Sequence, residues 1–563
     1  MTQFLSRISS QVQLAFVPHN TTDGDVWQLQ RHGTTTNDGT ASGTTIEDSD
    51  LGGSDDDFNG KYWIHILDGD AKGEWRRIAN YVASGGVVTL EGNGFTSQIT
   101  SGTAFELWKS PETVLVATQD SSFGGAYGPN HFFDDTTGKP DDYWIGWTMV
   151  PITGSGINDN RAMLITDFEA STGKFVLSGS PSWGATVFAG TPMLLRKFVD
   201  ATDISAGITE EYIPRGTTRT NFAKGDGVVG PRGGTFGFSI QIRPSGSLAS
   251  NNNKPGNANI TGLMESVGLE EFVGTSTTAD SGSTTTSIKI ATGTRERFEP
   301  GSMVIHNGNA TFVTSITDGG ASADTLTVSP ALPTAPASSD VIHATRLYKR
   351  STDGDTQGVT FEYVVDGVRH TLTGCKGNVT LNDGAAPTLS FEYQVDHWIR
   401  NIQSPGYANG SFYDATAPIL AQERLAYLAG SGVDINGFTA TPGTEVVAKS
   451  VQGSSGVNGR SGYQISNFAA GATFNKLLDA STATLPEDDF FQKRTAKELS
   501  VVFGSHSETF GVHIPQARMI ESPNPTDLEG VVGAPNVLEA QATTDLNVLS
   551  QPVAVPDFSF SIS

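Results

Sequence analysis

The chain contains 563 residues, which is too long for one ordinary domain and indicates three or more domains, each with its own core. Hydrophobic residues make up 37% of the sequence and 65 residues are glycine, a balance that favours short strands and tight turns over helix bundles. The formal net charge of −25 argues against a protein that wraps nucleic acid, because binding phosphates requires lysine and arginine. This charge remains compatible with an ordinary acidic protein and with a pore through which DNA slides.

Cysteine content and hydropathy indicate where the protein is made. Cys375 is the single cysteine, so the chain can form neither an internal disulfide nor a cysteine-cluster metal site. The first residues lack the apolar core of a secretory signal, and no stretch approaches the roughly 18 apolar residues of a membrane-spanning helix. We therefore expect a soluble protein that assembles in a reducing cytoplasm.

Internal repeats occur at three places in the chain. The sequence Tyr-Trp-Ile begins two segments with the same order of strand-like motifs, at residues 62–64 and 143–145, and a looser third copy runs from 286 to 348. Each copy is predicted to be a small all-β module of about four strands, because its apolar residues alternate and glycines separate the runs. The predicted modules are 55–110, 140–200 and 283–348.

The next elements are a strand and a short helix. In residues 235–242 the apolar side chains of Phe236, Phe238, Ile240 and Ile242 fall on one face, which predicts a half-buried strand. Residues 259–269 place four apolar side chains on one helical face, but two internal glycines predict that this helix is short.

Two hairpins and a second helix are predicted further along the chain. Asp366-Gly367 favours the type I′ turn of a hairpin between 359–365 and 368–372. Residues 417–428 are a second helix candidate, with a proline near the start. The strands of the second predicted hairpin are 377–381 and 388–394.

Motifs for catalysis are missing from the sequence. It contains no His-Glu-x-x-His pair, no Walker loop and no Gly-x-Ser-x-Gly elbow. His506 and His513 lie near each other, but in a strand-like region where a surface histidine is far more common than a metal ligand. We therefore predict no catalytic residue, no cofactor and no metal site.

Two further features are interpreted as structural. The acidic residues of 47–57 could bind a hard cation through their oxygens, but they lack the spacing of an EF-hand loop, which favours a solvated loop. Asp68-Gly69-Asp70 is typical of a turn. Trp63 and Trp144 could line a sugar site, yet their matching positions in two repeats favour packing in a core.

An ordered set of segments resembles the major tail tube proteins of long-tailed bacteriophages. The segments cover about half of the chain, mainly 200–275, 349–400 and 415–563, and their order carries the resemblance. The N-terminal 200 residues and the segment 276–348 have no counterpart in the minimal family. The segments that match are 210–215, 228–230, 236–242, 244–246, 260–269, 370–381, 389–393, 499–503, 510–515 and 527–530.

The resemblance implies an all-β fold with a tail-tube β-sandwich or barrel core, a short helix and several small peripheral β-modules. In this family, subunits join sheet edge to sheet edge around a lumen, and the rings stack into a tube that conducts DNA into the host. Some longer members carry two such domains in one chain and close as trimers with pseudo-sixfold symmetry. We expect a trimer or a hexamer here, with the trimer favoured.

This interpretation assigns a role to each part of the chain. Residues 1–200 form an N-terminal extension with two modules, 201–275 with 349–400 form a first tube-like domain, 276–348 form an inserted module, and 401–563 form a second tube-like domain or the C-terminal part of the core. The ring-closure strands are expected to be those that carry Phe236, Phe238, Ile240, Ile242, Val379, Leu381, Phe391 and Tyr393.

Partners and location follow from the same resemblance. The expected partners are other copies of the chain in stacked rings, other tail proteins at the tube ends, and phage DNA that passes without specific binding. A negatively charged lumen would repel the phosphates of that DNA. The protein would be part of the virion tail, assembled in the host cytoplasm. Because external modules leave little room for a sheath, the tail is expected to be non-contractile.

Three other functions remain open from the sequence. The chain could be a different virion protein, such as a distal tail ring, a decoration protein or a fibre. It could also be a carbohydrate-active β-sandwich enzyme, or a surface adhesin, although the lack of a secretion signal counts against the adhesin.

Overall fold

The fold is almost entirely β, as predicted. Among the described residues, the named helical elements are short: α1 (Leu263–Ser266) and the 3-10 turn η1 (Arg295–Arg297). Within the described ranges, no helix is long and apolar enough to cross a membrane. The computed structural model describes residues 13–18, 28–90, 94–109, 114–116, 131–133, 144, 147–151, 163–169, 171–178, 192–213, 228–244, 260, 262–320, 322–351, 358–365, 368–401, 418–420, 424–450, 460–477, 491, 495–505, 508–522, 526–528, 531–541 and 557–563.

Three segments of the chain each form a module of six antiparallel strands. Module 1 (28–109) contains β2 (Gln28–Thr34), β3 (Thr45–Glu47), β4 (Tyr62–Ile66), β5 (Trp75–Val82), β6 (Val87–Leu90) and β7 (Ala104–Lys109). Module 2 (114–198) contains β8 (Val114–Val116), β9 (His131–Phe133), β10 (Thr148–Pro151), β11 (Met163–Glu169), β12 (Lys174–Leu177) and β13 (Pro192–Phe198). Module 3 (277–344) contains β17 (Thr277–Thr278), β18 (Ser287–Ile290), β19 (Met303–His306), β20 (Asn309–Thr317), β21 (Asp324–Ser329) and β22 (Val341–Ala344).

The three modules share one topology. With strands counted along each module, the spatial order is 1-6-3-4-5-2 in all three. The repeats found in the sequence are therefore repeats of structure. The prediction of four strands per module was too low, because short strands such as β3 and β17 are too brief to show alternation. Modules 1 and 2 consequently begin well before the predicted starts at residues 55 and 140.

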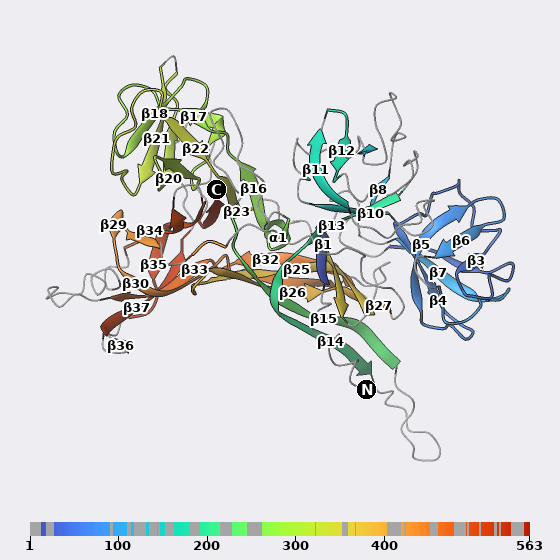
Figure 1. The fold of residues 1–563 in the computed structure, drawn as a ribbon. Coiled ribbons are helices and arrows are strands. Elements are labelled where there is room, and N and C mark those ends of the chain that lie inside the picture. Colours follow the sequence, from blue (N-terminus) through green and yellow to red (C-terminus); the bar gives the residue numbers. More distant parts are fainter. Residues whose placement is uncertain are drawn as a thin grey trace, which may run out of the picture.

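The largest layer is an eight-stranded sheet, which we call the platform sheet. It runs along the lower side of the molecule in Figure 1, from β14 at one end to β36 at the other. Its strands, in spatial order, are β14 (Ala201–Ile213), β15 (Val228–Gln241), β26 (Thr388–Val395), β25 (Val368–Asn382), β30 (Ile435–Thr441), β33 (Gly471–Leu477), β37 (Val531–Ala540) and β36 (Thr526–Leu528).

Two smaller sheets pack on one face of the platform sheet. The first has the order β1-β24-β25-β27, with β1 (Gln13–Pro18), β24 (Val359–Val365) and β27 (His397–Asn401). The second has the order β28-β34-β35-β38, with β28 (Leu425–Leu428), β34 (Lys497–Ser505), β35 (Glu508–Met519) and β38 (Ser559–Ile562). Strand β13 of module 2 extends the first of these sheets, and β23 (Arg346–Arg350) with β16 (Leu269–Val273) extends the second.

The core is a tandem duplication. In the first half of the platform sheet, β14, β15, β25 and β26 lie in the spatial order 1-2-4-3, and in the second half β30, β33, β36 and β37 lie in that same order. In each half, one strand of the covering sheet also pairs with a strand of the platform sheet. In the first half this strand is β25, which pairs with both β24 and β26, and in the second half it is β35, which pairs with both β34 and β37. The two covering sheets also match strand for strand.

Burial supports most of the predicted strands. Phe236, Phe238, Ile240 and Ile242 are all buried in one hydrophobic cluster that runs through both halves of the core. Both predicted hairpins are confirmed by their strand registers, which pair Val365 with Val368 in the first and Leu381 with Leu389 in the second. The helix predicted in 259–269 is present as the four residues of α1.

The helix predicted in 417–428 is wrong for its described residues. Residues 425–428 form β28, which pairs with β34. Ala426 and Leu428 are buried there, whereas Leu425 is 55% exposed. This short apolar run satisfies both helical and strand spacing, and tertiary pairing with β34 decides the outcome.

Modules 1 and 3 dock on corresponding parts of the two halves. Module 3 buries Met303 and Phe312 against Val502 of β34, and Phe312 stacks on His513 of β35 at 4.9 Å between ring centroids. Module 1 packs its tryptophans against β27, where Trp75 contacts the His397 ring at a centroid distance of 5.2 Å. Module 3 also contacts β38, the counterpart of β27, where the Met303 N–H donates to Ser561 Oγ at 3.2 Å. The two modules therefore dock on equivalent strands of the two halves.

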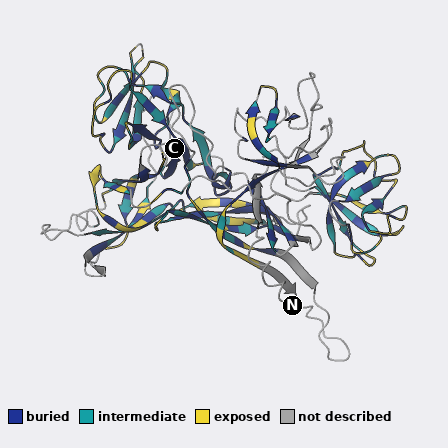
Figure 2. Cartoon of the chain, in the orientation of Figure 1, coloured by how far each residue is buried: buried dark blue, intermediate teal, exposed yellow. Residues whose placement is uncertain are grey.

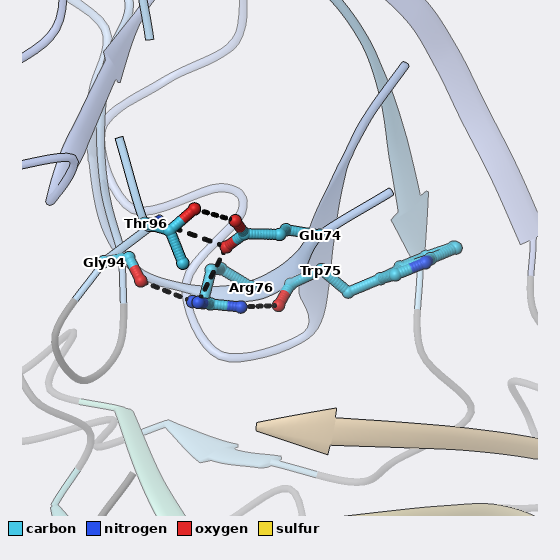
Figure 3. Close-up of polar contacts among 5 residues, drawn as sticks. All are labelled: Glu74, Trp75, Arg76, Gly94 and Thr96. Carbon is cyan, nitrogen blue, oxygen red and sulfur yellow. Dashed lines mark hydrogen bonds and ion pairs between the residues drawn. The ribbon is translucent and has the colours of Figure 1, made fainter. Parts of the chain in front are cut away.

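A polar cluster holds β5 of module 1 in place beside this contact (Figure 3). The Arg76 guanidinium donates to the Gly94 carbonyl at 2.6 Å and to Glu74 at 2.9 Å. Glu74 also accepts the Thr96 N–H at 3.2 Å, and the Thr96 hydroxyl donates to the same carboxylate. Trp75 lies between Glu74 and Arg76 in the sequence, so this cluster fixes the segment from which Trp75 reaches the core.

Candidate functional surface

The exposed face of the platform sheet is the broadest regular surface of the core. Side chains alternate along each strand, so one set enters the core and the other set lies on the face opposite the covering sheets (Figure 2). This outward-facing set, whose members are exposed or half-buried, consists mainly of hydroxyl and amide side chains. It includes Thr235, Ser239, Gln241, Asn378, Thr380, Asn382, Ser390, Gln394, Thr439, Thr473 and Asn475.

Hydrogen bonds connect these side chains across neighbouring strands. The Ser239 and Ser390 hydroxyls are 2.9 Å apart, and the Asn382 amide donates to Ser390 Oγ at 3.0 Å. In the second half, the Thr439 and Thr473 hydroxyls are 2.5 Å apart. The face is therefore a hydrogen-bonded polar layer on both halves, which adds cross-strand stabilisation to the sheet.

Charged groups are sparse on this face. Among the described residues, the charges at exposed positions of the sheet are Glu392, Glu539 and Arg518, together with Asp203 at a bulge of β14. Arg518 and Glu539 occupy directly opposite positions on β35 and β37. The charges described on this face are therefore three acidic groups and one basic group, a small negative excess. The acidity of the chain lies elsewhere, for example in the loops of module 1.

The eight residues predicted to mark the ring-closure strands all lie in the core. Each of them is at most 2% exposed, so their side chains contact neighbours within the chain. Strand β26 and residues 234–240 of β15 have hydrogen-bonded partners of the same chain on both sides, which leaves these segments no edge for another subunit. Within the part of the chain that the structure describes, the edges of the platform sheet are instead β14 and β36.

The two halves meet at a seam between β25 and β30. Leu381 pairs with Ala440 and Asn382 with Thr439, which makes the sheet continuous across the duplication. The Asp383 N–H donates to the Phe438 carbonyl at 2.8 Å, and Arg424 forms an ion pair with the Asp383 side chain. This seam thus combines main-chain pairing with one ion pair.

A hairpin arm crosses the seam. Strands β31 (Thr444–Ser450) and β32 (Arg460–Phe468) pair with each other and lie over the first half. The Thr444 hydroxyl donates to the Val267 carbonyl at 2.7 Å, and the Thr444 N–H donates to Asn378 Oδ1 of β25 at 3.0 Å. The second half therefore holds the first half with an arm as well as with a strand edge.

A buried ion cluster joins three parts of the chain. Glu362 of β24 accepts a hydrogen bond from Arg196 of module 2 at 2.8 Å, and Arg77 of module 1 lies 3.7 Å away. Burial alone would raise the pKa of Glu362, but the charges of Arg196, Arg369 and Arg77 outweigh it and lower this pKa to about 2. The carboxylate therefore stays ionised and ties both N-terminal modules to the core.

One cluster has the residue types of a hydrolase triad but lacks its geometry. The Ser500 hydroxyl lies 3.0 Å from His513 Nδ1, and Glu498 lies 3.7 Å from that same nitrogen. In a working triad the serine and the carboxylate bind opposite ring nitrogens, and the serine faces substrate. Here His513 is fully buried beneath module 3, and burial lowers its pKa to about 3. His506, its predicted neighbour, lies outside the described residues.

The acidic loops serve as turn caps in module 1. Asp55 accepts the Ala83 N–H at 2.7 Å, Asp57 accepts the Ser54 N–H at 2.6 Å, and Asp68 accepts the Ala104 N–H at 2.8 Å. Across the described ranges, no group of three or more acidic, histidine or cysteine side chains is placed to hold a metal ion. Trp63 and Trp144 are buried, as their repeat positions predicted.

Comparisons with known proteins add no relative. A scan against protein-family models finds no match, and a search of curated proteins finds none.

Proposed function

We propose that this chain is a structural virion subunit that forms the stacked rings of a bacteriophage tail tube and conducts DNA into the host. One observation carries the proposal. The platform sheet is built from two halves with the same strand order, and it ends in an edge strand on each side. Further copies can extend such a sheet edge to edge until a ring closes, which also covers edges that would otherwise promote aggregation.

The duplication favours a ring of three chains over a ring of six. Each chain contributes two halves with matching topology, so three chains place six equivalent sheets around the lumen. Closed rings with one repeated interface are a common form of homo-oligomer. A trimer with pseudo-sixfold symmetry therefore uses the duplication directly.

The surfaces of the chain suit this arrangement. The polar face of the platform sheet would line the lumen, where the scarcity of lysine and arginine among its described residues leaves little to retain DNA phosphates. The three modules lie on the other side of the core and would cover the outside of the tube (Figure 1). A coat of this size leaves little space for a sheath, so we propose a non-contractile tail. Other tail proteins would bind the ends of the tube.

Electron microscopy of the purified full-length protein tests the proposal. We expect negative-stain images of the concentrated and incubated protein to contain hollow rings or tubes, with three chains in each ring. Closed rings that never stack would favour a distal tail ring, and solid fibres would favour a fibre protein. Cleavage of cell-wall or capsular polysaccharide, abolished by a single Asp or Glu substitution, would favour the enzyme alternative.

A further inference from the structure

The seam between the two halves is a template for a contact between two copies of the chain. At this seam the third strand of one half pairs with the first strand of the next half, β25 with β30. The platform sheet ends in the counterparts of these strands, with β36 in the third position and β14 in the first. The two edge strands of the platform sheet therefore correspond to the two strands that already pair with each other at the seam.

The two halves can be aligned residue by residue. Gly233-Gly234-Thr235-Phe236 of β15 corresponds to Gly471-Ala472-Thr473-Phe474 of β33, and both phenylalanines are buried while both threonines are exposed. The partners of the two phenylalanines are Tyr393 on β26 and Asn536 on β37.

Two independent features support this alignment. The first feature is the spacing between the hairpin turn and the partner of the phenylalanine. In the first half the hairpin ends at the pair Asn382–Thr388, and Tyr393 follows Thr388 by five residues; in the second half it ends at Leu528–Val531, and Asn536 follows Val531 by five residues. The second feature is an irregularity at the same aligned position in the first strand of each half. In β14 the pairing register shifts between Glu210 and Tyr212, and at the aligned position of the second half β30 ends and β31 begins. Under this alignment Gly207 corresponds to Thr439, and Leu528 corresponds to Asn382.

We infer that one copy of the chain binds the next by pairing β36 with β14, with Leu528 opposite Gly207 and Asp527 opposite Ile208. These are the counterparts of the seam pairs Asn382–Thr439 and Leu381–Ala440. The bound partner is a second copy of this chain, because its edge continues an interface that already exists within the chain. The inference rests on the proposed ring for its closure, but the register is a separate claim.

The arm at the start of the sheet extends the same contact. The end of β14 and the beginning of β15 pair with each other beyond the core and project from the molecule (Figure 1). Their counterparts in the second half are β31 and β32, which cross the seam and contact the first half. The projecting arm of one copy accordingly crosses onto the second half of the copy whose β36 it meets.

Disulfide cross-linking in the full-length protein tests the register. In the variant Gly207→Cys/Leu528→Cys, the two sulfurs belong to opposite residues of an antiparallel pair, whose Cα separation of about 4.5–5.5 Å permits a disulfide. A Cβ at Gly207 would meet the Thr235 hydroxyl at 3.1 Å, the end of a small side chain. The native Cys375 is buried and serves as the background in every variant.

Three controls accompany this variant. Asn382→Cys/Thr439→Cys should close a disulfide within one chain and form no larger species. Each single variant, Gly207→Cys or Leu528→Cys alone, should form far fewer cross-linked chains than the double variant under the same oxidising conditions. Ser205→Cys/Leu528→Cys displaces one partner by two residues along β14 and should cross-link far less than the matched pair.

The expected result is a reductant-sensitive ladder of two and three linked chains from Gly207→Cys/Leu528→Cys, with the three-chain species as the end point. Rings in the electron microscope without this cross-link, or with stronger linkage of the Ser205→Cys pair, would overturn the register and leave the proposed tube standing. A protein that forms neither rings nor cross-links would contradict the contact and the proposed function together.

Discussion

At the scale of single residues, buried charge and buried histidine connect the modules to the core. Glu362 neutralises arginines that come from two modules and from its own sheet, although none of these residues belongs to a recognisable motif. His513 lies under module 3 with its ring against Phe312. Neither role could be predicted from the sequence, because both depend on which distant segments pack together. Both lead to predictions about stability.

Replacing the buried carboxylate should destabilise the protein. Glu362→Gln removes the carboxylate charge that faces the buried Arg196 and Arg77 guanidiniums, and breaking a buried ion pair typically costs about 3–5 kcal/mol. Chemical denaturation of the purified variant measures this loss. Glu169→Gln, which removes an ion pair with Lys174 at the surface, is the matched control and should leave the midpoint unchanged. Equal midpoints for both variants would contradict the proposed junction.

The buried histidine should make the protein sensitive to acid. The pKa of His513 is about 3 in the folded chain and near 6.5 when unfolded, so below pH 6.5 the unfolded chain binds a proton that the folded chain does not. Its stabilisation is complete above pH 6.5 and is lost as the pH falls toward 3. We expect His513→Gln to lose less stability than the unmodified protein between pH 7 and pH 4.5 in denaturant titrations. Parallel pH curves for the two proteins would show that this residue does not contribute.

At the scale of elements, the two faces of the platform sheet differ in the same way in both halves. The face toward the covering sheets is apolar in both halves, whereas the other face consists of hydroxyl and amide groups with few charges. Alternation in the sequence predicted the buried face of β15, and it also predicted the two hairpins. It could not distinguish edge strands from central strands, since both alternate in the same way.

Adding cations to the polar face should change how an assembled tube treats DNA. Thr235→Lys and Thr473→Lys place lysines at exposed positions in equivalent strands, and the lost contact between the Thr473 and Thr439 hydroxyls should cost about 0.2–1 kcal/mol of stability. If this face lines the lumen, assembled tubes of the double variant should retain DNA oligonucleotides at low salt and release them as salt rises. The same lysine count placed on module 3 at Thr285 and Ser322, outside the lumen, provides the control. Equal DNA retention by both variants would place the polar face elsewhere.

At the scale of the whole molecule, the net charge opposes the association of identical chains. Each copy carries a formal charge of −25, and copies in a ring repel one another until salt screens them, with a Debye length of about 10 Å at 0.1 M. We expect sedimentation velocity to show more assembly at 0.5 M than at 0.05 M sodium chloride. Assembly that weakens with salt would indicate that ion pairs between chains, rather than strand pairing, dominate the contact.

The sequence by itself determined the all-β class, the hairpins, the buried face of β15 and the existence of three related modules, because these depend on local alternation and on turn residues. Tertiary structure alone decided that each module has six strands, that 425–428 is a strand, and that the core is a duplicated sheet with β14 and β36 at its edges. It also decided that Phe236, Tyr393 and the other residues expected at the ring contact lie inside the core. The physical reason is that strand neighbours are chosen by hydrogen bonds between segments far apart in the chain. A strand's own sequence records which face is buried, but not which strand lies beside it.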